Sequence, residues 1–100
     1  MIKLIALYKK PEDEAAFMAH YDTVHRPLVE AIPGLAAIRI SRMVGAPTGG
    51  DAPYFLMAEM AFADRETFDA AMASPENRAA GKDLISFAKG IVTLMIAEGD

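Results

Sequence analysis

The sequence predicts one α+β domain with the element order β–α–β–β–α–β, in which four antiparallel strands carry helices on one face. Three observations lead to this prediction. The chain has 100 residues, enough for one domain and one core, so we expect the domain to span residues 1–100. Four short apolar stretches alternate with longer stretches of helical periodicity. There is no cysteine, so no disulfide framework shapes the fold.

Four segments are predicted to be strands because they are short and rich in apolar or β-branched residues: 2–8, 35–44, 54–62 and 91–97. The glycine- and proline-rich residues 45–53 join the middle two as an antiparallel hairpin. In a sheet with one wet face, polar and apolar residues alternate, yet the first and last strands are apolar on both faces. Helices can cover only one face, so we expect a second copy to cover the other in a two-fold homodimer.

The first helical segment follows the acidic residues 12–14, and its inner face comprises Phe17, Tyr21, Val24 and Leu28. Pro27 interrupts this pattern because it lacks an N–H group and disfavours helical angles at Arg26. We therefore expect a break or kink between Val24 and Arg26, with Pro27 opening a last short helical segment.

A second helical region follows the third strand. Asp64 is its predicted N-cap, and Ser74 is the N-cap of a further helix with Pro75 at the first helical position. Gly90 is predicted to close that helix. The resulting order is that of the ferredoxin-like split βαβ arrangement.

Composition excludes several classes of function. The net charge is −4 and no basic cluster is present, so we expect no nucleic-acid partner. The N-terminal apolar stretch is too short for a signal peptide, no run approaches the ~20 apolar residues of a membrane span, and cysteine is absent; we therefore expect a cytoplasmic protein. No phosphate-binding glycine motif or set of metal ligands occurs, so we expect no nucleotide cofactor and no dedicated metal site.

The candidate site residues lie on the first helix. His20 and His25 are five residues apart, about 140° around an α-helix, which places them on opposite shoulders. His25 is either a structural histidine bonded to a carbonyl near the helix break or a pocket residue. His20 is expected to be a solvated shoulder residue. Tyr21 is either a core aromatic or a residue that points its hydroxyl into a cavity.

Charged residues within the strands form a second group of candidates. Arg39 or Arg42 is expected to pair with Glu59 across the hairpin, as a structural or a catalytic ion pair. The sequence leaves open which arginine does so. The seven methionines either line an adaptable apolar pocket or pack the core.

Residues 20–29, read as His-Tyr-Asp-Thr-Val-His-Arg-Pro-Leu-Val, together with Ile-Pro-Gly-Leu at 32–35, resemble the EthD family pattern. That pattern is an aromatic residue, then His-x-Pro-Leu, then Pro-Gly-Leu before the second strand. The segment from Phe62 to Phe87, with Ala-Ser-Pro-Glu at 73–76 and Asp83, is similar to the family's second helical region.

The resemblance implies a dimeric α+β barrel with a pocket between sheet and helices, His25 as general acid/base or orienting donor, and Tyr21 as a hydrogen-bond partner. It implies an ethyl tert-butyl ether degradation protein-like role in small-molecule catabolism or tailoring, on an apolar or aromatic molecule. A cofactor-independent oxidoreductase, isomerase or cyclase would fit. A non-catalytic small-molecule-binding or accessory protein is the alternative, and haem binding with His25 as axial ligand is a third.

Overall fold

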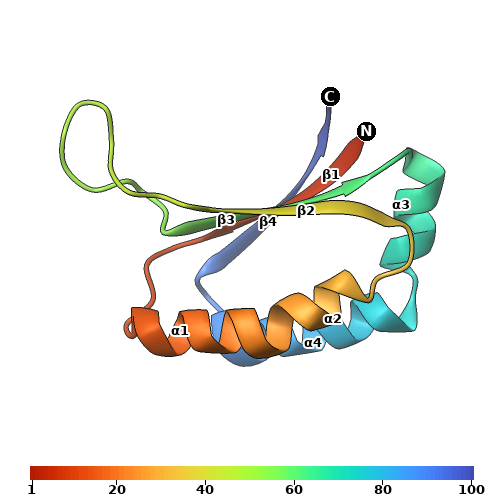
Figure 1. Ribbon diagram of the computed structural model, residues 1–100, viewed down its shortest axis with the longest axis horizontal. Coiled ribbons are helices and arrows are strands. Elements are labelled where there is room, and N and C mark those ends of the chain that lie inside the picture. The colour runs from red at the N-terminus through yellow and green to blue at the C-terminus, as the bar shows by residue number, and fades with distance from the viewer.

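The computed structural model describes residues 1–100, which form a four-stranded sheet and a layer of helices (Figure 1). The strands are β1 (Ile2–Tyr8), β2 (Leu35–Arg42), β3 (Leu56–Phe62) and β4 (Val92–Glu98). The helical segments are α1 (Glu14–His20), the π-helical turn η1 (Tyr21–His25), α2 (Arg26–Glu30), α3 (Arg65–Met72) and α4 (Pro75–Ala88). The predicted ferredoxin-like α+β fold is confirmed.

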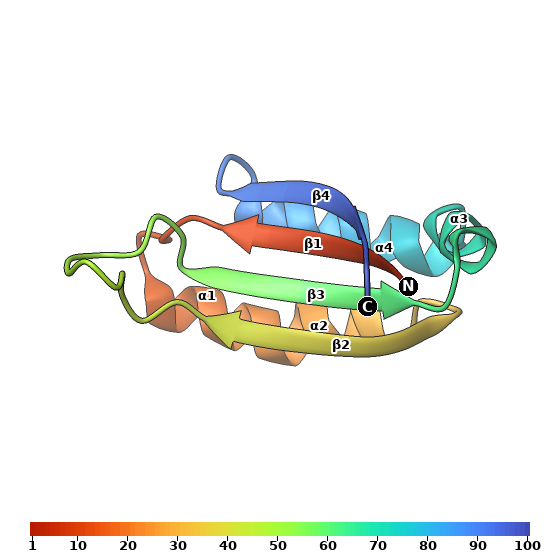
Figure 2. The ribbon, with the colours of Figure 1, turned by 90° about the horizontal axis from the view of Figure 1, so that it is seen from above.

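The sheet has the strand order β2-β3-β1-β4, and each neighbouring pair is antiparallel. Seen from above, one face of the sheet carries no helix, whereas α1 and α2 lie beneath the β2 side and α4 beneath the β4 side (Figure 2). The loop between β2 and β3 projects from one end of the sheet, and α3 stands at the other (Figure 1). None of the helices combines the length and the apolar content that crossing a bilayer requires.

The core lies between the sheet and the helices. Alternate residues of the two central strands face it, and those that are buried are Ile2, Ala6, Tyr8, Leu56, Ala58, Met60 and Phe62. From the helical side they meet Phe17, Tyr21, Val29, Phe68, Ala71, Ala80 and Ala88. Each large side chain buried in this way contributes roughly 1.5–3 kcal/mol of transfer free energy.

The intervening residues of β1, Ile5 and Leu7, therefore point to the helix-free face of the sheet. The pairing register sets Met95 of β4 beside Ile5 and Met57 of β3 beside Leu7. These four residues form an apolar patch on this face, and Glu59 of β3 lies beside Ile5 on its other side. We call these four residues the free-face cluster.

The expected ion pair on the hairpin does not form. Arg39 lies directly opposite Glu59 on the helix-free face, but no ion pair joins their charged groups. Arg42 instead contacts Glu14 of α1, with 3.3 Å between Nη2 and Oε1, and its guanidinium lies 5.0 Å from the centre of the Phe55 ring. Arg42 therefore contacts the start of α1 from the edge strand β2 and does not pair with Glu59.

The predicted helix caps are present. The Asp64 carboxylate accepts a hydrogen bond from the Thr67 N–H at 2.8 Å, and the Ser74 hydroxyl accepts one from the Asn77 N–H at 3.1 Å. Gly90 follows α4 with a φ of 83°, a value that glycine adopts without strain. Two strand ends differ slightly from prediction: β2 ends at Arg42 and β3 begins at Leu56, so the loop between them is longer than the predicted residues 45–53.

Gly34 makes a close contact that leads to a stability prediction. Its φ is 82°, and a Cβ atom there would lie 2.6 Å from Thr67 Cγ2. We expect Gly34→Ala to lower the free energy of unfolding by roughly 2–4 kcal/mol, from backbone strain plus overlap. Gly90→Ala is the matched control, since it has a similar φ and nothing within 4 Å. Urea unfolding at equal protein concentration measures both, and adding Thr67→Ala to Gly34→Ala should recover part of the loss. Equal losses in the two glycine variants would contradict the role of the contact.

Candidate functional site

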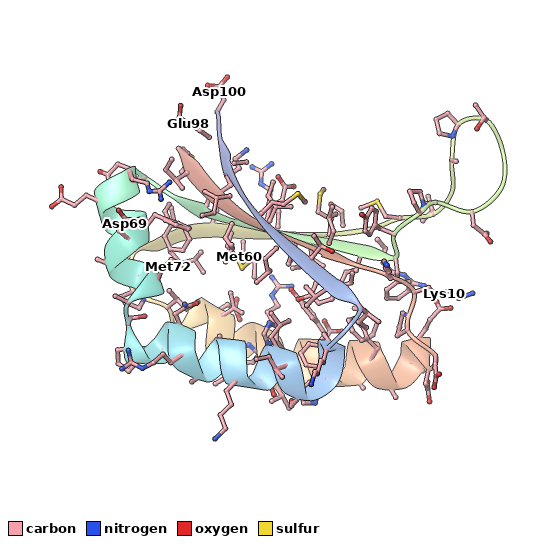
Figure 3. All side chains as sticks on the ribbon, turned by 180° about the vertical axis from the view of Figure 1, so that it is seen from behind. Lys10, Met60, Asp69, Met72, Glu98 and Asp100 are labelled. Carbon is pink, nitrogen blue, oxygen red and sulfur yellow. The ribbon has the colours of Figure 1, made fainter.

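A cavity of about 170 Å³ lies between the sheet and the helices. Of its 15 lining residues 12 are hydrophobic, and the lining comes from β1, β3 and β4 of the sheet and from η1, α2, α3 and α4 of the helical layer. Two of the methionines line it: Met60 of β3 and Met72 at the end of α3, both drawn between sheet and helices in Figure 3. Leu94 of β4 also lines the cavity and is 50% exposed, so the cavity opens beside this edge strand.

Tyr21 lies in the cavity wall, with its ring packed edge-on against Tyr8 at 5.9 Å between centroids. Both residues are almost fully buried, and neither hydroxyl bonds to a protein group. Every polar side-chain atom that is completely buried has a hydrogen-bond partner, so these two hydroxyl oxygens must keep some accessible surface. Both oxygens are therefore open to the cavity. Burial raises the pKa of the Tyr21 hydroxyl to about 12, and burial, then Tyr21 and Asp83, raise the pKa of Tyr8. Each hydroxyl is thus an uncharged hydrogen-bond donor at neutral pH.

His25 also lies in the wall and is 5% exposed. Its Nδ1 atom is 3.0 Å from Oδ2 of Asp83 on α4. An ionised carboxylate only accepts hydrogen bonds, so Nδ1 carries the proton and Nε2 keeps its lone pair. Burial lowers the pKa of His25, although the hydrogen bond and the charge of Asp83 act in the opposite direction. The ring is therefore a neutral base held in one tautomer by a carboxylate.

The helix does not break where the sequence predicts. Arg26, just before Pro27, keeps helical angles of φ −57° and ψ −45°, so the expected loss of helical angles at Arg26 is wrong, although the regular α-helix is interrupted in the predicted region. The helix widens instead: the Arg26 N–H bonds to the carbonyl of Tyr21, five residues back, as in a π-helix. The Thr23 hydroxyl bonds the Ala19 carbonyl at 2.6 Å within the same segment. Pro27 opens α2 as predicted.

The widened turn changes the position of His20. Residues five apart come close to one full turn in a π-helix, so His20 and His25 share a face instead of occupying opposite shoulders. His20 Nε2 lies 2.9 Å from Asp83 Oδ1 and 3.1 Å from Oδ2. The expectation of a solvated shoulder residue is therefore wrong, although the His20 side chain remains 33% exposed.

Sequence reasoning missed two members of the site, Asp83 and Tyr8. Asp83 lies on α4, 58 residues from His25, and no spacing in the sequence links them. Tyr8 ends an apolar strand, and only the alternation of β1 places its ring on the helix side. The cavity is smaller than the roughly 300–1,000 Å³ of pockets that hold drug-sized ligands, so it does not fit haem. No group of three or more His, Cys, Asp or Glu side chains is arranged to hold a metal ion.

Fold and site together define a ferredoxin-like α+β domain with a mostly apolar cavity and a histidine–carboxylate pair in its wall. The model of the EthD domain matches residues 9–90, and the chain belongs to the EthD family. It is 33% identical over 101 residues to an uncharacterised 11.0 kDa protein of the thcB–thcC intergenic region of Rhodococcus erythropolis, covering 98% of this chain and 94% of that protein.

Two solved structures extend the comparison. An ethyl tert-butyl ether degradation (EthD) family protein from Bacillus halodurans superposes with a TM-score of 0.95 at 46% identity, over 100% of this chain and 99% of that chain. A dimeric ferredoxin-like protein of unknown function from Thermobifida fusca superposes with a TM-score of 0.71 at 19% identity, over 98% and 90% of the respective chains. The second likeness shows the shared fold.

Proposed function

We propose that this EthD-family protein binds a small, uncharged, apolar or aromatic molecule in the cavity and moves a proton on it, with His25 as the base and Tyr21 as a hydrogen-bond donor. The observation that carries the proposal is the His25–Asp83 pair at the wall of an otherwise apolar space. Proton abstraction is a step that cofactor-independent oxidoreductases, isomerases and cyclases can all use, so the proposal covers these classes.

The lining determines the class of ligand. It contains no Lys, Arg, Asp or Glu, so a charged ligand would lose its hydration without gaining a counter-ion. A dry apolar cavity of about 150 Å³ can hold benzene, so the present volume suits a molecule with one small ring. The Tyr8 and Tyr21 hydroxyls favour an oxygen acceptor on that ring, such as a carbonyl or a phenolic oxygen.

The same groups support the proton transfer. A general base must be unprotonated at the working pH, and burial keeps His25 uncharged there. A tyrosine hydroxyl that is open to the cavity can stabilise the negative charge that develops on a ligand oxygen when a neighbouring C–H or O–H proton leaves. His25 and Tyr21 would thus act on the same ligand from one helix, since they begin and end the turn η1.

The alternative is a binding or accessory protein that holds the same molecule without changing it. The apolar lining favours this alternative, because it provides affinity with few polar contacts. Recovery of a ligand unchanged after long incubation with the protein would support it.

We also propose that the chain acts as a homodimer that pairs the helix-free sheet faces. The free-face cluster supplies the apolar centre, and its β4 member, Met95, is an exposed large apolar side chain. Solved proteins of this fold that are described as dimeric, such as the one from Thermobifida fusca, support the arrangement.

A cavity-filling variant tests the binding site. Gly81 lines the cavity, and a Cβ there would meet nothing within 4 Å, so a side chain can start at this position and Gly81→Leu should occupy part of the space. Small phenols, lactones, quinones and ethers are screened by thermal shift. A ligand at ~100 times its Kd adds about 2.7 kcal/mol, a rise of roughly 10–20 °C in Tm for a domain of this size.

Gly81→Leu should abolish that rise while keeping or raising the Tm of the free protein, because glycine weakens a helix. Ala79→Leu is the matched control, since Ala79 lies on the same helix, is exposed and does not line the cavity. A shift that survives in Gly81→Leu would place the ligand elsewhere. Benzoate, as a charged analogue, should give a much smaller shift than phenol.

A further inference from the structure

Asp83 contacts both histidines at once, one on the cavity side and one on the solvent side. Oδ2 holds His25 Nδ1 at 3.0 Å, and Oδ1 holds His20 Nε2 at 2.9 Å. The His25 side chain is 6% exposed and borders the cavity, whereas His20 is 33% exposed on the outer surface. The carboxylate, 13% exposed, thus links the cavity wall to the solvent.

We propose that His20 is a positioning residue for His25: it anchors Asp83 and, when protonated, keeps the cavity histidine in its uncharged, proton-accepting form. The inference rests on the proposed role of His25 as the base. Only one of the two rings can readily carry the positive charge beside Asp83, since a second charge would be unpaired. Burial disfavours the charged form of His25, and a positive charge on His20 across the shared carboxylate disfavours it further.

The surroundings hold both rings in place. The Phe87 ring, one turn after Asp83 on α4, lies 4.5 Å from the His20 ring and 5.1 Å from the His25 ring. With Phe87 and Asp83 fixed on one helix, neither imidazole can turn away without losing both contacts. A third contact to the carboxylate is weak: the Ser86 hydroxyl is 3.5 Å from Oδ1 and donates to the Asp83 carbonyl at 2.6 Å.

Other ionisable groups face the three residues. Those in the surface groove beside His20 are Lys10, Glu12, Asp13 and Lys89. Those on the cavity side are Tyr8 and Tyr21, and Asp22, Arg26 and Glu30 act on Tyr21. All of them stay unchanged in the variants below, so a difference between variants reports the His20–Asp83–His25 contacts.

The test is NMR of protein labelled with ¹⁵N at histidine, which reports the tautomer and titration of each ring without any ligand. In the wild type, His25 should show a slowly exchanging Nδ1–H. His20→Gln keeps a donor to Asp83 but removes the charge, so the titration midpoint of His25 should move to higher pH with its Nδ1–H retained. His20→Ala removes the donor as well, so the Nδ1–H signal should be lost to exchange with water.

Asp83→Asn should move the midpoint of His25 in the opposite direction, to lower pH, because the negative charge is gone. Ser86→Ala is the matched control and should change neither the midpoint nor the Nδ1–H signal. If His20→Gln leaves the His25 midpoint where it is in the wild type, the proposal is overturned. His20→Gln alone decides the matter if His20→Ala fails to fold.

These outcomes are separable from the proposed function. A wild-type protein that shows the NMR shifts but moves no proton on any ligand would lose the proposed function and keep the coupling of the two histidines. A protein that moves protons through His25 but shows no shift in His20→Gln would keep the function and lose the role of His20.

Discussion

The variant His25→Gln should lose nearly all proton transfer on a bound ligand while keeping the ligand. Glutamine has a similar size and can still bond to Asp83, but it cannot accept a proton near neutral pH. Removal of a general base lowers rates by about 10²–10⁴-fold. The measurement is ¹H NMR in D₂O, which follows the replacement of carbon-bound ligand protons by deuterium for a compound found by thermal shift. The thermal shift itself should remain within a few degrees of the wild type.

The pH dependence gives a second check on the same residue. Only the uncharged ring can take a proton, and burial lowers the pKa of His25 below its ordinary value of about 6.5. The rate of proton transfer by the wild type should therefore rise with pH and reach its plateau at a lower pH than an ordinary histidine would give. Unchanged exchange in His25→Gln would exclude this residue as the base. Tyr54→Phe controls for substitution in general, because Tyr54 lies outside the cavity.

The variant Leu7→Glu should turn a dimer into a monomer or prevent folding. Leu7 lies in the free-face cluster between Met57 and Thr93, so a glutamate there would face an apolar partner surface. Two-fold symmetry places two such charges in one interface. Burying an unpaired carboxylate costs several kcal/mol, so the dissociation constant of the dimer should rise by roughly 10³-fold or more.

Sedimentation equilibrium at low micromolar concentration measures this effect. Ile85→Glu is the matched control: Ile85 is a 63% exposed apolar residue on α4, so the same charge should leave the association unchanged. A wild-type protein that is folded and monodisperse at the monomer mass of 10.8 kDa would exclude the dimer.

Local signals predicted the fold well. The caps Asp64 and Ser74 could be read from residue type and spacing, because each acts within three residues of its own position. The strands could be read because their apolar pattern reflects which faces are covered. The hairpin pairing could not, since the register that sets Arg39 opposite Glu59 depends on the length and path of the loop.

The candidate site was only half predictable. Tyr21 and His25 stand out because a tyrosine on an inner helix face and a histidine beside a proline are unusual enough to notice. Asp83 does not stand out, because its role depends on how α4 packs against the first helix. The π turn was missed for a different reason. Apolar residues at four-, three- and four-residue spacing fit a regular helix equally well, and the proline rule favours a break.

The π turn also bears on how this site arose and how easily it can be lost. A π turn has the geometry of an α-helix into which one residue has been inserted, with the surplus absorbed as a bulge. Deleting one residue from 21–25 would restore regular winding and rotate the preceding segment by about 100° relative to α2. His20 would then swing away from Asp83 while the core positions after the deletion kept their place. Phe17 lies on the same rotated segment and belongs to the core, so the contact of the second histidine cannot be gained or lost in this way without repacking the core.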